Sequence, residues 1–160
     1  MKFQFLLFLA FGFLLNSGFV GCGSGRAGNV SDNGPAPGVQ FIQSNEFDPV
    51  LETAAAEGKL VFIDFYTDWC GPCKLMDREV FSDRNLGEFF DDNFISYKVN
   101  AEKGNGGVLS TVYGVKAFPT LLFVDSEGKV LERAENSLTI SQLRRMANDA
   151  LAAGDVGMVD

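Results

Sequence analysis

Hydrophobic and polar positions follow two different periods along residues 39–154. The nearly continuous apolar run from Leu60 to Tyr66 is rich in β-branched and aromatic residues and predicts a strand buried on both faces. Phe94 to Asn100 is typical of a second central strand. Shorter strands are expected at 39–42, 120–124 and 129–134. The turn sequence Asp125 to Gly128 separates the last two and predicts that they pair as a hairpin.

Apolar residues between these strands recur at helical spacing. The first such stretch runs from Phe47 to Ala55, and its helix can be capped by Ser44 or Asn45 and ended by Gly58. Further helices are predicted from the apolar residues within 75–80, 86–90 and 108–113. Residues 102–107 are expected to form a loop.

The ends of two later helices also carry sequence signals. Ser82 can cap the helical turn that contains Leu86 and Phe90. Thr139 and Gln142 fit a capping box, in which each side chain hydrogen-bonds the backbone at the other's position. The apolar stripe of a final helix follows directly.

The resulting order is strand, helix, strand, helix, strand, helix, strand, strand, helix. This order predicts an α/β fold with a central mixed β-sheet flanked by helices on both faces. The 160 residues of the chain suit a single domain. We assign that domain to residues 39–154 and expect a loose tail at 155–160.

The N-terminal segment has the composition of an export signal. Lys2 precedes a mostly apolar run from Phe3 to Val20, which is typical of a secretory signal. The small residues just before Cys22 resemble the lipobox of bacterial lipoproteins, which implies that residues 1–21 are removed and that Cys22 is lipid-modified. An uncleaved anchor, or an ordinary signal with a chance cysteine, is the alternative. Residues 22–38 are rich in Gly, Ser, Asn and Pro and predict a flexible linker.

Charge and composition exclude several classes of function. The formal net charge is −8, and an acidic chain repels phosphate backbones, so nucleic acid is not an expected partner. The chain has no histidine, which excludes Ser-His-Asp and Cys-His catalysis and most catalytic zinc sites. Three cysteines cannot form a four-thiolate zinc site within one chain. We therefore expect neither a metal nor another cofactor.

Cys70 and Cys73 lie where a buried strand is expected to lead into a helix. Thiol–disulfide exchange needs a thiolate, and the free amides and dipole at a helix N-terminus favour Cys70 as an anion. Cys73 comes one turn later on the same face, within reach to form a disulfide and to resolve a mixed disulfide on Cys70. Gly71 keeps the turn tight, and Pro72 fixes a helical φ. A purely structural disulfide is the weaker interpretation, because so short a loop restricts the unfolded chain little.

Residues 39 to about 152 resemble the thioredoxin family. The pentapeptide Trp69-Cys70-Gly71-Pro72-Cys73 is that of thioredoxin itself, and Val115 to Thr120 matches a second family signature. The resemblance implies that Pro119 is a cis-proline facing the disulfide. It also implies that Trp69, Gly71, Pro72, Phe118 and Pro119 form the substrate groove, with the Phe118 backbone pairing to a bound peptide in strand fashion.

Asp64 lies in an otherwise apolar strand, and a buried carboxylate is costly unless it has a partner or a chemical role. The family resemblance implies that Asp64 lies beneath the second cysteine and relays its proton, with a pKa raised by burial. It also implies that Lys98 neighbours Asp64. The alternatives are a merely hydrogen-bonded strand aspartate and a solvated strand lysine.

The segment from Leu75 to Asp83 is more similar to the C-terminal domain of the transmembrane reductase DsbD. We therefore expect a lipid-anchored, extracytoplasmic thiol–disulfide oxidoreductase on the periplasmic side of a bacterial membrane. The Gly-Pro dipeptide favours reduction of protein disulfides. The expected partners are exported proteins with disulfides, including apocytochromes, and a membrane electron donor of the DsbD type. Nothing in the sequence demands more than a monomer.

Three other functions remain open from the sequence. Within the same chemistry, the protein could be a disulfide oxidase or isomerase. A non-catalytic, lipid-anchored binding or holdase module is the alternative of another class. A Cu(I) carrier is the third, since two thiolates can hold that ion, although no Met or His cluster accompanies them.

Overall fold

The computed structural model describes residues 38–157. The predicted export signal, Cys22 and nearly all of the predicted linker lie outside the described residues, as do residues 158–160. The described chain forms five strands and five helices around one sheet. Their bounds are β1 Phe41–Ile42, α1 Asp48–Glu57, β2 Leu60–Tyr66, α2 Gly71–Glu79, α3 Arg84–Asn93, β3 Phe94–Asn100, α4 Gly106–Val112, β4 Thr120–Val124, β5 Val130–Ala134 and α5 Ile140–Gly157.

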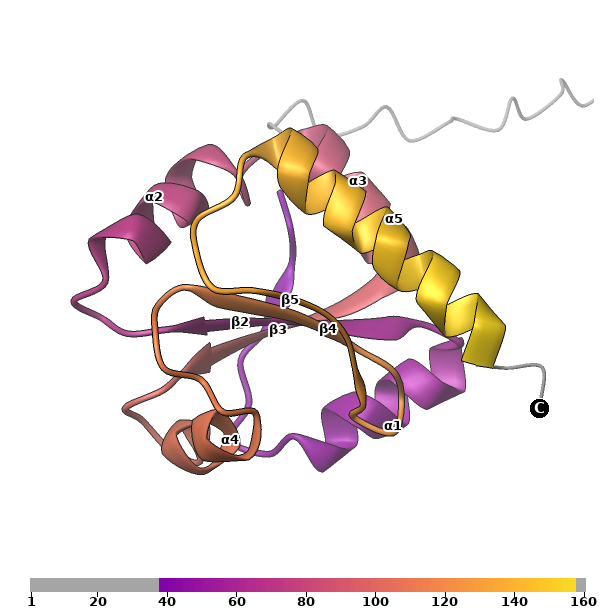
Figure 1. Ribbon diagram of the computed structural model, residues 1–160, viewed down its shortest axis with the longest axis horizontal. Coiled ribbons are helices and arrows are strands. Elements are labelled where there is room, and N and C mark those ends of the chain that lie inside the picture. Colours follow the sequence, from indigo (N-terminus) through magenta and orange to yellow (C-terminus); the bar gives the residue numbers. More distant parts are fainter. Residues whose placement is uncertain (1–37, 158–160) are drawn as a thin grey trace, which may run out of the picture. The chain divides into compact units, whose positions relative to one another are not determined.

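The sheet is mixed, with strand order β1-β3-β2-β4-β5. The strands β1, β3 and β2 run parallel, while β4 is antiparallel to both β2 and β5. Figure 1 shows α2, α3 and α5 on one side of the sheet and α1 and α4 on the other. The predicted α/β fold with helices on both faces is therefore confirmed.

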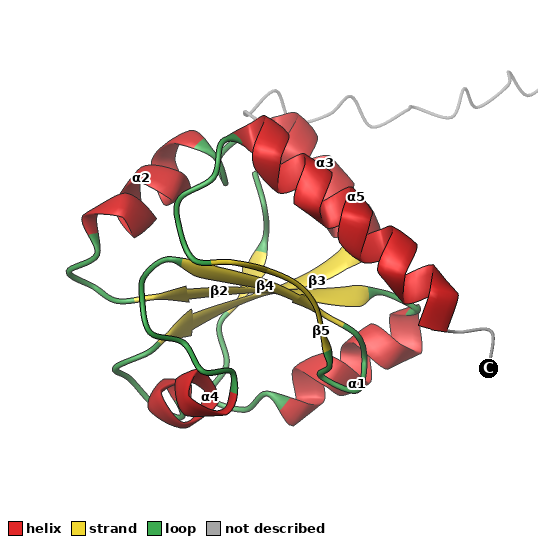
Figure 2. Cartoon of the chain, in the orientation of Figure 1, coloured by secondary structure: helices red, strands yellow, loops and turns green. Residues whose placement is uncertain are grey.

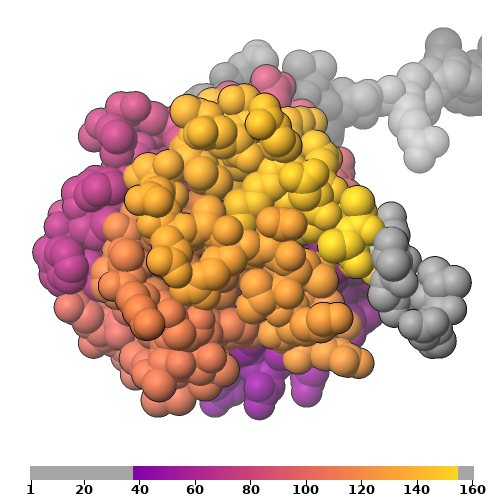
Figure 3. Space-filling view, viewed as in Figure 1, coloured from indigo at the N-terminus to yellow at the C-terminus, as the bar shows by residue number. Residues whose placement is uncertain are grey.

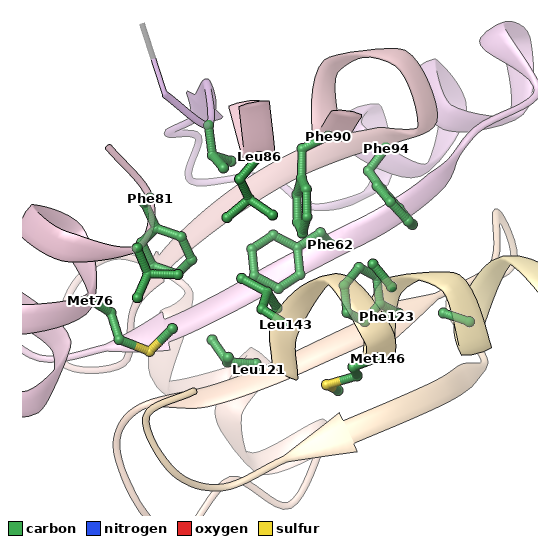
Figure 4. Packing of buried hydrophobic residues seen from close by; sticks show 14 residues of the cluster. Phe62, Met76, Phe81, Leu86, Phe90, Phe94, Leu121, Phe123, Leu143 and Met146 are labelled. Carbon is green, nitrogen blue, oxygen red and sulfur yellow. The ribbon is translucent and has the colours of Figure 1, made fainter. Parts of the chain in front are cut away.

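Alternation along the strands divides the hydrophobic core into two layers. On β2, Phe62 points toward α2, α3 and α5, whereas Val61 and Ile63 point toward α1 and α4. The first layer is strongly aromatic: the ring of Phe62 lies 5.0 Å from that of Phe90 and 4.9 Å from that of Phe123, measured between centroids. Figure 4 shows this packing around Phe62. In the space-filling view, α5 and the residues around β5 cover much of the face in front (Figure 3).

Two of the predicted helix ends agree with the structure. Gly58 ends α1 with a left-handed φ of 64°, which glycine adopts without strain. The capping box is present before α5. The Thr139 amide donates to Gln142 Oε1 at 2.9 Å, and the Gln142 amide donates to Thr139 Oγ1 at 3.3 Å.

Two predicted caps are wrong. Neither Ser44 nor Asn45 caps α1; the residue before that helix is Phe47, and Pro49 in the first turn removes one amide that would need a partner. The cap of α3 is Asp83 rather than Ser82, with Asp83 Oδ1 accepting from the Leu86 amide at 2.8 Å. A carboxylate is favoured there because it also interacts with the positive end of the helix dipole.

Three element bounds differ from the prediction by two residues or more. The strand β1 is shorter, because the Val39 amide donates to the Phe81 carbonyl instead of pairing with β3. The helix α4 begins earlier, at Gly106, where a Cβ atom would lie 1.9 Å from the Asn100 carbonyl oxygen, so that only glycine fits. The helix α5 continues to Gly157, beyond the predicted domain end at 154.

The connections that follow β2, β3 and β5, and the one that precedes β4, all lie at the same end of the sheet. In Figure 2 these green loops gather at the left of the molecule, beside the first turn of α2. Because functional residues in α/β folds concentrate where strands end in loops, we expect the functional site at this end of the sheet.

Candidate active site

Cys70 and Cys73 form a disulfide at the first turn of α2, with 5.3 Å between their Cα atoms. Cys70 is the N-cap residue, and its sulfur accepts a hydrogen bond from the Cys73 amide at 3.1 Å. Pro72 lies within the first turn, where its missing N–H has no intrahelical partner to lose. The helix therefore begins at the cysteine itself, and in the reduced state its amides and dipole favour a thiolate on Cys70.

Asp64 and Lys98 are brought together by the pairing of β2 with β3, in which they are direct partners. The Lys98 ammonium lies 2.5 Å from Asp64 Oδ2, and the two side chains are 9% and 1% exposed. Lys98 is thus not a solvated strand lysine. Asp64 shares the sheet face of Phe62, which is the face that α2 covers.

Asp77 is a second carboxylate on the same lysine, and sequence reasoning missed it. Its Oδ1 lies 2.6 Å from the Lys98 ammonium. Asp77 follows Cys73 by four residues on α2, so both belong to the same side of the helix. That spacing was the available signal, but an acidic residue on an exposed helix is too common to have pointed to a buried lysine.

Three aromatic rings complete the surroundings of the Lys98 ammonium. The ring centroids of Phe41, Tyr66 and Phe81 lie 4.9, 4.8 and 5.2 Å from it. A cation over the faces of aromatic rings is stabilised by their quadrupoles, more so where water is excluded. The cluster thus replaces the hydration of a nearly buried cation with two carboxylates and three rings.

The pKa values of the pair follow from burial and mutual attraction. Burial raises the pKa of Asp64 above its usual value, against the opposing attraction and hydrogen bond of Lys98, and the charge of Asp77 raises it further. Burial lowers the pKa of Lys98, but its interactions with Asp64 and Asp77 outweigh this and leave that pKa raised. Asp64 Oδ1 has no hydrogen-bond partner among the described residues, so this oxygen is free to accept a proton.

The loop before β4 lies at the same end of the sheet as the disulfide. The Phe118–Pro119 peptide bond is cis, as the family resemblance implies. Pairing of Phe65 with Thr120 places this loop beside the end of β2. The ring of Phe118 stands edge-on to that of Trp69 with centroids 6.0 Å apart, and Trp69 is 67% exposed. An exposed aromatic surface thus adjoins the cysteine pair.

The loop after β3 braces the same region through contacts that sequence reasoning did not foresee. The Trp69 indole N–H donates to Glu102 Oε1 at 2.9 Å. Asp68 accepts a hydrogen bond from Asn100 Nδ2 at 2.8 Å and pairs with the Lys103 ammonium at 2.6 Å. The hydrogen bond from Lys103 lowers the pKa of Asp68 below its usual value.

Two other sequence expectations bear on the site. Cys22 lies outside the described residues, so the structure does not place it. Residues 38–157 contain no group of three or more His, Cys, Asp or Glu side chains arranged to hold a metal ion. In the same part of the chain, no helix has both the length and the apolar character needed to cross a bilayer.

Comparison with known proteins places this site in a family. Residues 47–151 match the model of the thioredoxin-like domain. Thioredoxin-T of Drosophila melanogaster is 36% identical over 55% of this chain and 52% of its own length. The thiol:disulfide interchange protein DsbD of Pseudomonas fluorescens is 30% identical over 84% of this chain and 24% of its own length. The chain thus spans about half or less of the length of these curated relatives.

A solved structure agrees with the sequence matches. The solution structure of a candidate disulphide-isomerase from Bacteroides thetaiotaomicron superposes with a TM-score of 0.65 and 37% identity, over 72% of this chain and 95% of that one. The match to the family model spans both the cysteine pair and the loop that carries the cis peptide bond. From its disulfide, its fold and these matches, the chain belongs to the thioredoxin-like family of thiol–disulfide oxidoreductase domains.

Proposed function

We propose that this protein reduces disulfides of exported proteins. A lipid on Cys22 holds it outside the cytoplasm. The observation that carries the proposal is the Cys70–Cys73 disulfide at the N-terminus of α2, on the sheet face that also holds the buried carboxylate of Asp64. A short disulfide of this kind contributes little to stability through loop closure, so its placement at a helix N-terminus favours a redox role.

The reaction begins from the dithiol form. The Cys70 thiolate attacks one sulfur of the substrate disulfide, so that the substrate S–S bond breaks and a mixed disulfide forms while the other substrate sulfur leaves as a thiolate. Cys73 then attacks the Cys70 sulfur, breaks the mixed disulfide and releases the second substrate thiol. Two electrons have passed to the substrate, and the protein is left in the disulfide form that the structure shows.

The second step needs a base, because Cys73 must lose its proton before it can attack. Asp64 is suited to be that base, because its pKa is raised by burial and its Oδ1 has no other hydrogen-bond partner among the described residues. Lys98 holds Oδ2 and thereby fixes the orientation of the carboxylate. Asp64 then passes its proton on to solvent.

Three observations support the proposed direction of electron transfer and the proposed location of the protein. The Gly-Pro dipeptide between the cysteines is associated with the reducing end of the family. The segment that follows resembles DsbD, and a DsbD is among the similar proteins. The apolar N-terminal run and Cys22 have the pattern of a lipoprotein signal followed by a linker over residues 22–38. Electrons would then come from a membrane donor of the DsbD type.

A redox titration tests the direction of the reaction. The full chain is equilibrated in dithiothreitol or glutathione redox buffers while the fluorescence of Trp69, the only tryptophan, is followed. A reductase should show a potential near that of thioredoxin, about −270 mV, whereas a value of about −180 to −120 mV would favour an isomerase or oxidase. A protein without any redox-dependent transition would be a binding module instead.

The lipid anchor is tested separately from the chemistry. Cells that express the wild-type chain should incorporate labelled fatty acid into it, and the Cys22→Ser variant should not. Labelling that persists in this variant would rule out Cys22 as the lipid attachment site while leaving the redox proposal intact.

A further inference from the structure

Arg133 links two loops at the end of the sheet where the disulfide lies. It belongs to β5, and its guanidinium crosses to the C-terminal end of α4. There Nη1 donates to the Tyr113 carbonyl at 2.7 Å and Nη2 donates to the Gly114 carbonyl at 3.1 Å. Two consecutive carbonyls that end a helix are thus held by one planar side chain.

The third side of the guanidinium is occupied as well. Its Nε donates to Glu135 Oε1 at 2.8 Å, and Nη2 lies 2.7 Å from the same carboxylate. Contacts on all three nitrogens fix the plane of the group, which a lysine could not reproduce with a single ammonium. Glu135 therefore orients the Arg133 guanidinium toward the two carbonyls.

These two carbonyls lie at the start of the loop that carries the cis-proline. Gly114 is followed by Val115 to Pro119 and then by β4. At the far end of this loop, Thr120 Oγ1 donates to the Ala117 carbonyl at 2.8 Å. The loop is thus tied at its start by Arg133 and at its end by Thr120.

Strand register brings the Arg133–Glu135 pair beside the same loop. In the antiparallel pairing of β4 with β5, Leu121 lies opposite Ala134. Continuing that register by one residue sets Glu135 opposite Thr120, directly after Pro119. Phe118 in this loop makes an edge-on contact with Trp69, the residue that precedes Cys70.

We propose that Arg133 is a positioning residue that sets the backbone of the 115–119 loop for a bound peptide, with Glu135 orienting its guanidinium. This inference rests on the proposed function. Arg133 would act on substrates that extend along the loop and not on the exchange chemistry itself. It should therefore matter for a protein disulfide and be dispensable for a small one.

The test compares two substrates in the full-length protein. The variant Arg133→Lys keeps the charge but loses the fork. We expect kcat/KM for insulin reduction, with dithiothreitol as electron source, to fall about fivefold, mainly through KM. The rate of reaction with hydroxyethyl disulfide, followed by Trp69 fluorescence, should stay within about twofold of wild type, because exchange at Cys70 itself is untouched.

A matched control is available on α5. Arg144 also donates to a backbone carbonyl, that of Asn85 at 3.3 Å, and stacks on Phe89, but it lies outside the loops at the redox end. The Arg144→Lys variant should change neither rate. A second variant, Glu135→Gln, keeps a hydrogen-bonding side chain and should show the same split between substrates at smaller size, about twofold.

Different results have different consequences. Equal losses for insulin and for hydroxyethyl disulfide in both variants would mean a structural role and overturn the inference. Unchanged insulin kinetics in Arg133→Lys would overturn it too. A wild-type protein that reacts with neither substrate would contradict the proposed function, and the role of Arg133 would fall with it.

Discussion

Phe62 and Asp64 lie two residues apart on β2 and point to the same face of the sheet, yet their nearest partners differ in chemistry, although Phe81 contacts both the Phe62 ring and the ammonium beside Asp64. Phe62 packs against the rings of Phe81, Phe90 and Phe123. Asp64 faces the ammonium of Lys98, which is shared with another carboxylate. One strand therefore supports an aromatic region and, at its carboxyl end, a charged one.

The two regions contribute differently to the molecule. Burial of aromatic rings stabilises the fold through apolar area and contacts between rings. Burial of a carboxylate and an ammonium costs desolvation energy that their attraction offsets only in part. A protein gains little stability from such a cluster, which agrees with the proton-transfer role that we propose for Asp64. Each variant below alters one region and should spare the other.

The largest effect is expected at the cysteines. Cys70→Ser removes the nucleophile and should abolish reduction of insulin, while Cys73→Ser should accumulate a mixed disulfide with substrate, detectable by mass spectrometry. Neither change touches the aromatic region, so thermal unfolding should match that of the reduced wild type. Full cellular function of the double serine variant would instead support a binding or holdase module.

A change in the aromatic region should do the reverse. Phe62→Ala removes a fully buried ring and should lower the free energy of unfolding by about 3–5 kcal/mol, measured by urea denaturation. The redox potential of the folded fraction should not move. Phe89→Ala, at a partly buried ring of the same cluster, is the control and should cost less. A clear shift of the redox potential in Phe62→Ala would mean that the aromatic and the charged regions are coupled.

Removing the buried negative charge should trade activity for stability. Asp64→Asn cannot accept a proton, so insulin reduction near neutral pH should fall about a hundredfold. The folded pKa of Asp64 is raised above 3.8, so the favourable contribution of this group is present below pH 3.8 and is lost as the pH rises toward the folded value. The variant should therefore unfold at higher urea concentration than wild type at pH 7, with no such gain below pH 3.8. Equal stability at both pH values would contradict the burial of an ionised Asp64.

Features that depend on neighbouring residues could be predicted from the sequence, whereas contacts between distant elements could not. The strands β2 and β4 and the end of α1 at Gly58 depend on local pattern and were predicted from it, whereas the cis-proline was expected from the family resemblance. The cap of α3 was missed by one residue, because Ser82 and Asp83 are both good caps and only packing decides between them.

Contacts made by long side chains between elements were beyond local pattern. The contact of Lys98 with Asp77 and those of Arg133 with Tyr113 and Gly114 each join separate elements of the fold. They depend on how a helix is rotated about its axis and on which rotamer a long side chain adopts. Lys98 and Asp64 could be paired in advance only through the family resemblance.

The smallest effect, and the sharpest test of the charged region, is expected at Asp77. Its charge raises the pKa of Asp64, and it shares the Lys98 ammonium. Asp77→Asn should therefore lower the pKa of Asp64 and move the acidic limb of the pH–rate profile for insulin reduction to lower pH. The shift should be less than about one unit, because Asp77 is partly exposed and water screens its charge. Activity at pH 7 and urea stability should stay close to wild type.

Asp92→Asn is the matched control, since it removes the same charge from an exposed position on α3 and should leave the profile in place. If both variants move the limb equally, the effect belongs to net charge and not to the lysine. If Asp77→Asn moves the limb to higher pH, Asp77 must hold Lys98 against Asp64 rather than compete for it. Only a shift to lower pH that is confined to Asp77 fits a lysine divided between two carboxylates, with the basicity of Asp64 set by how that lysine is shared.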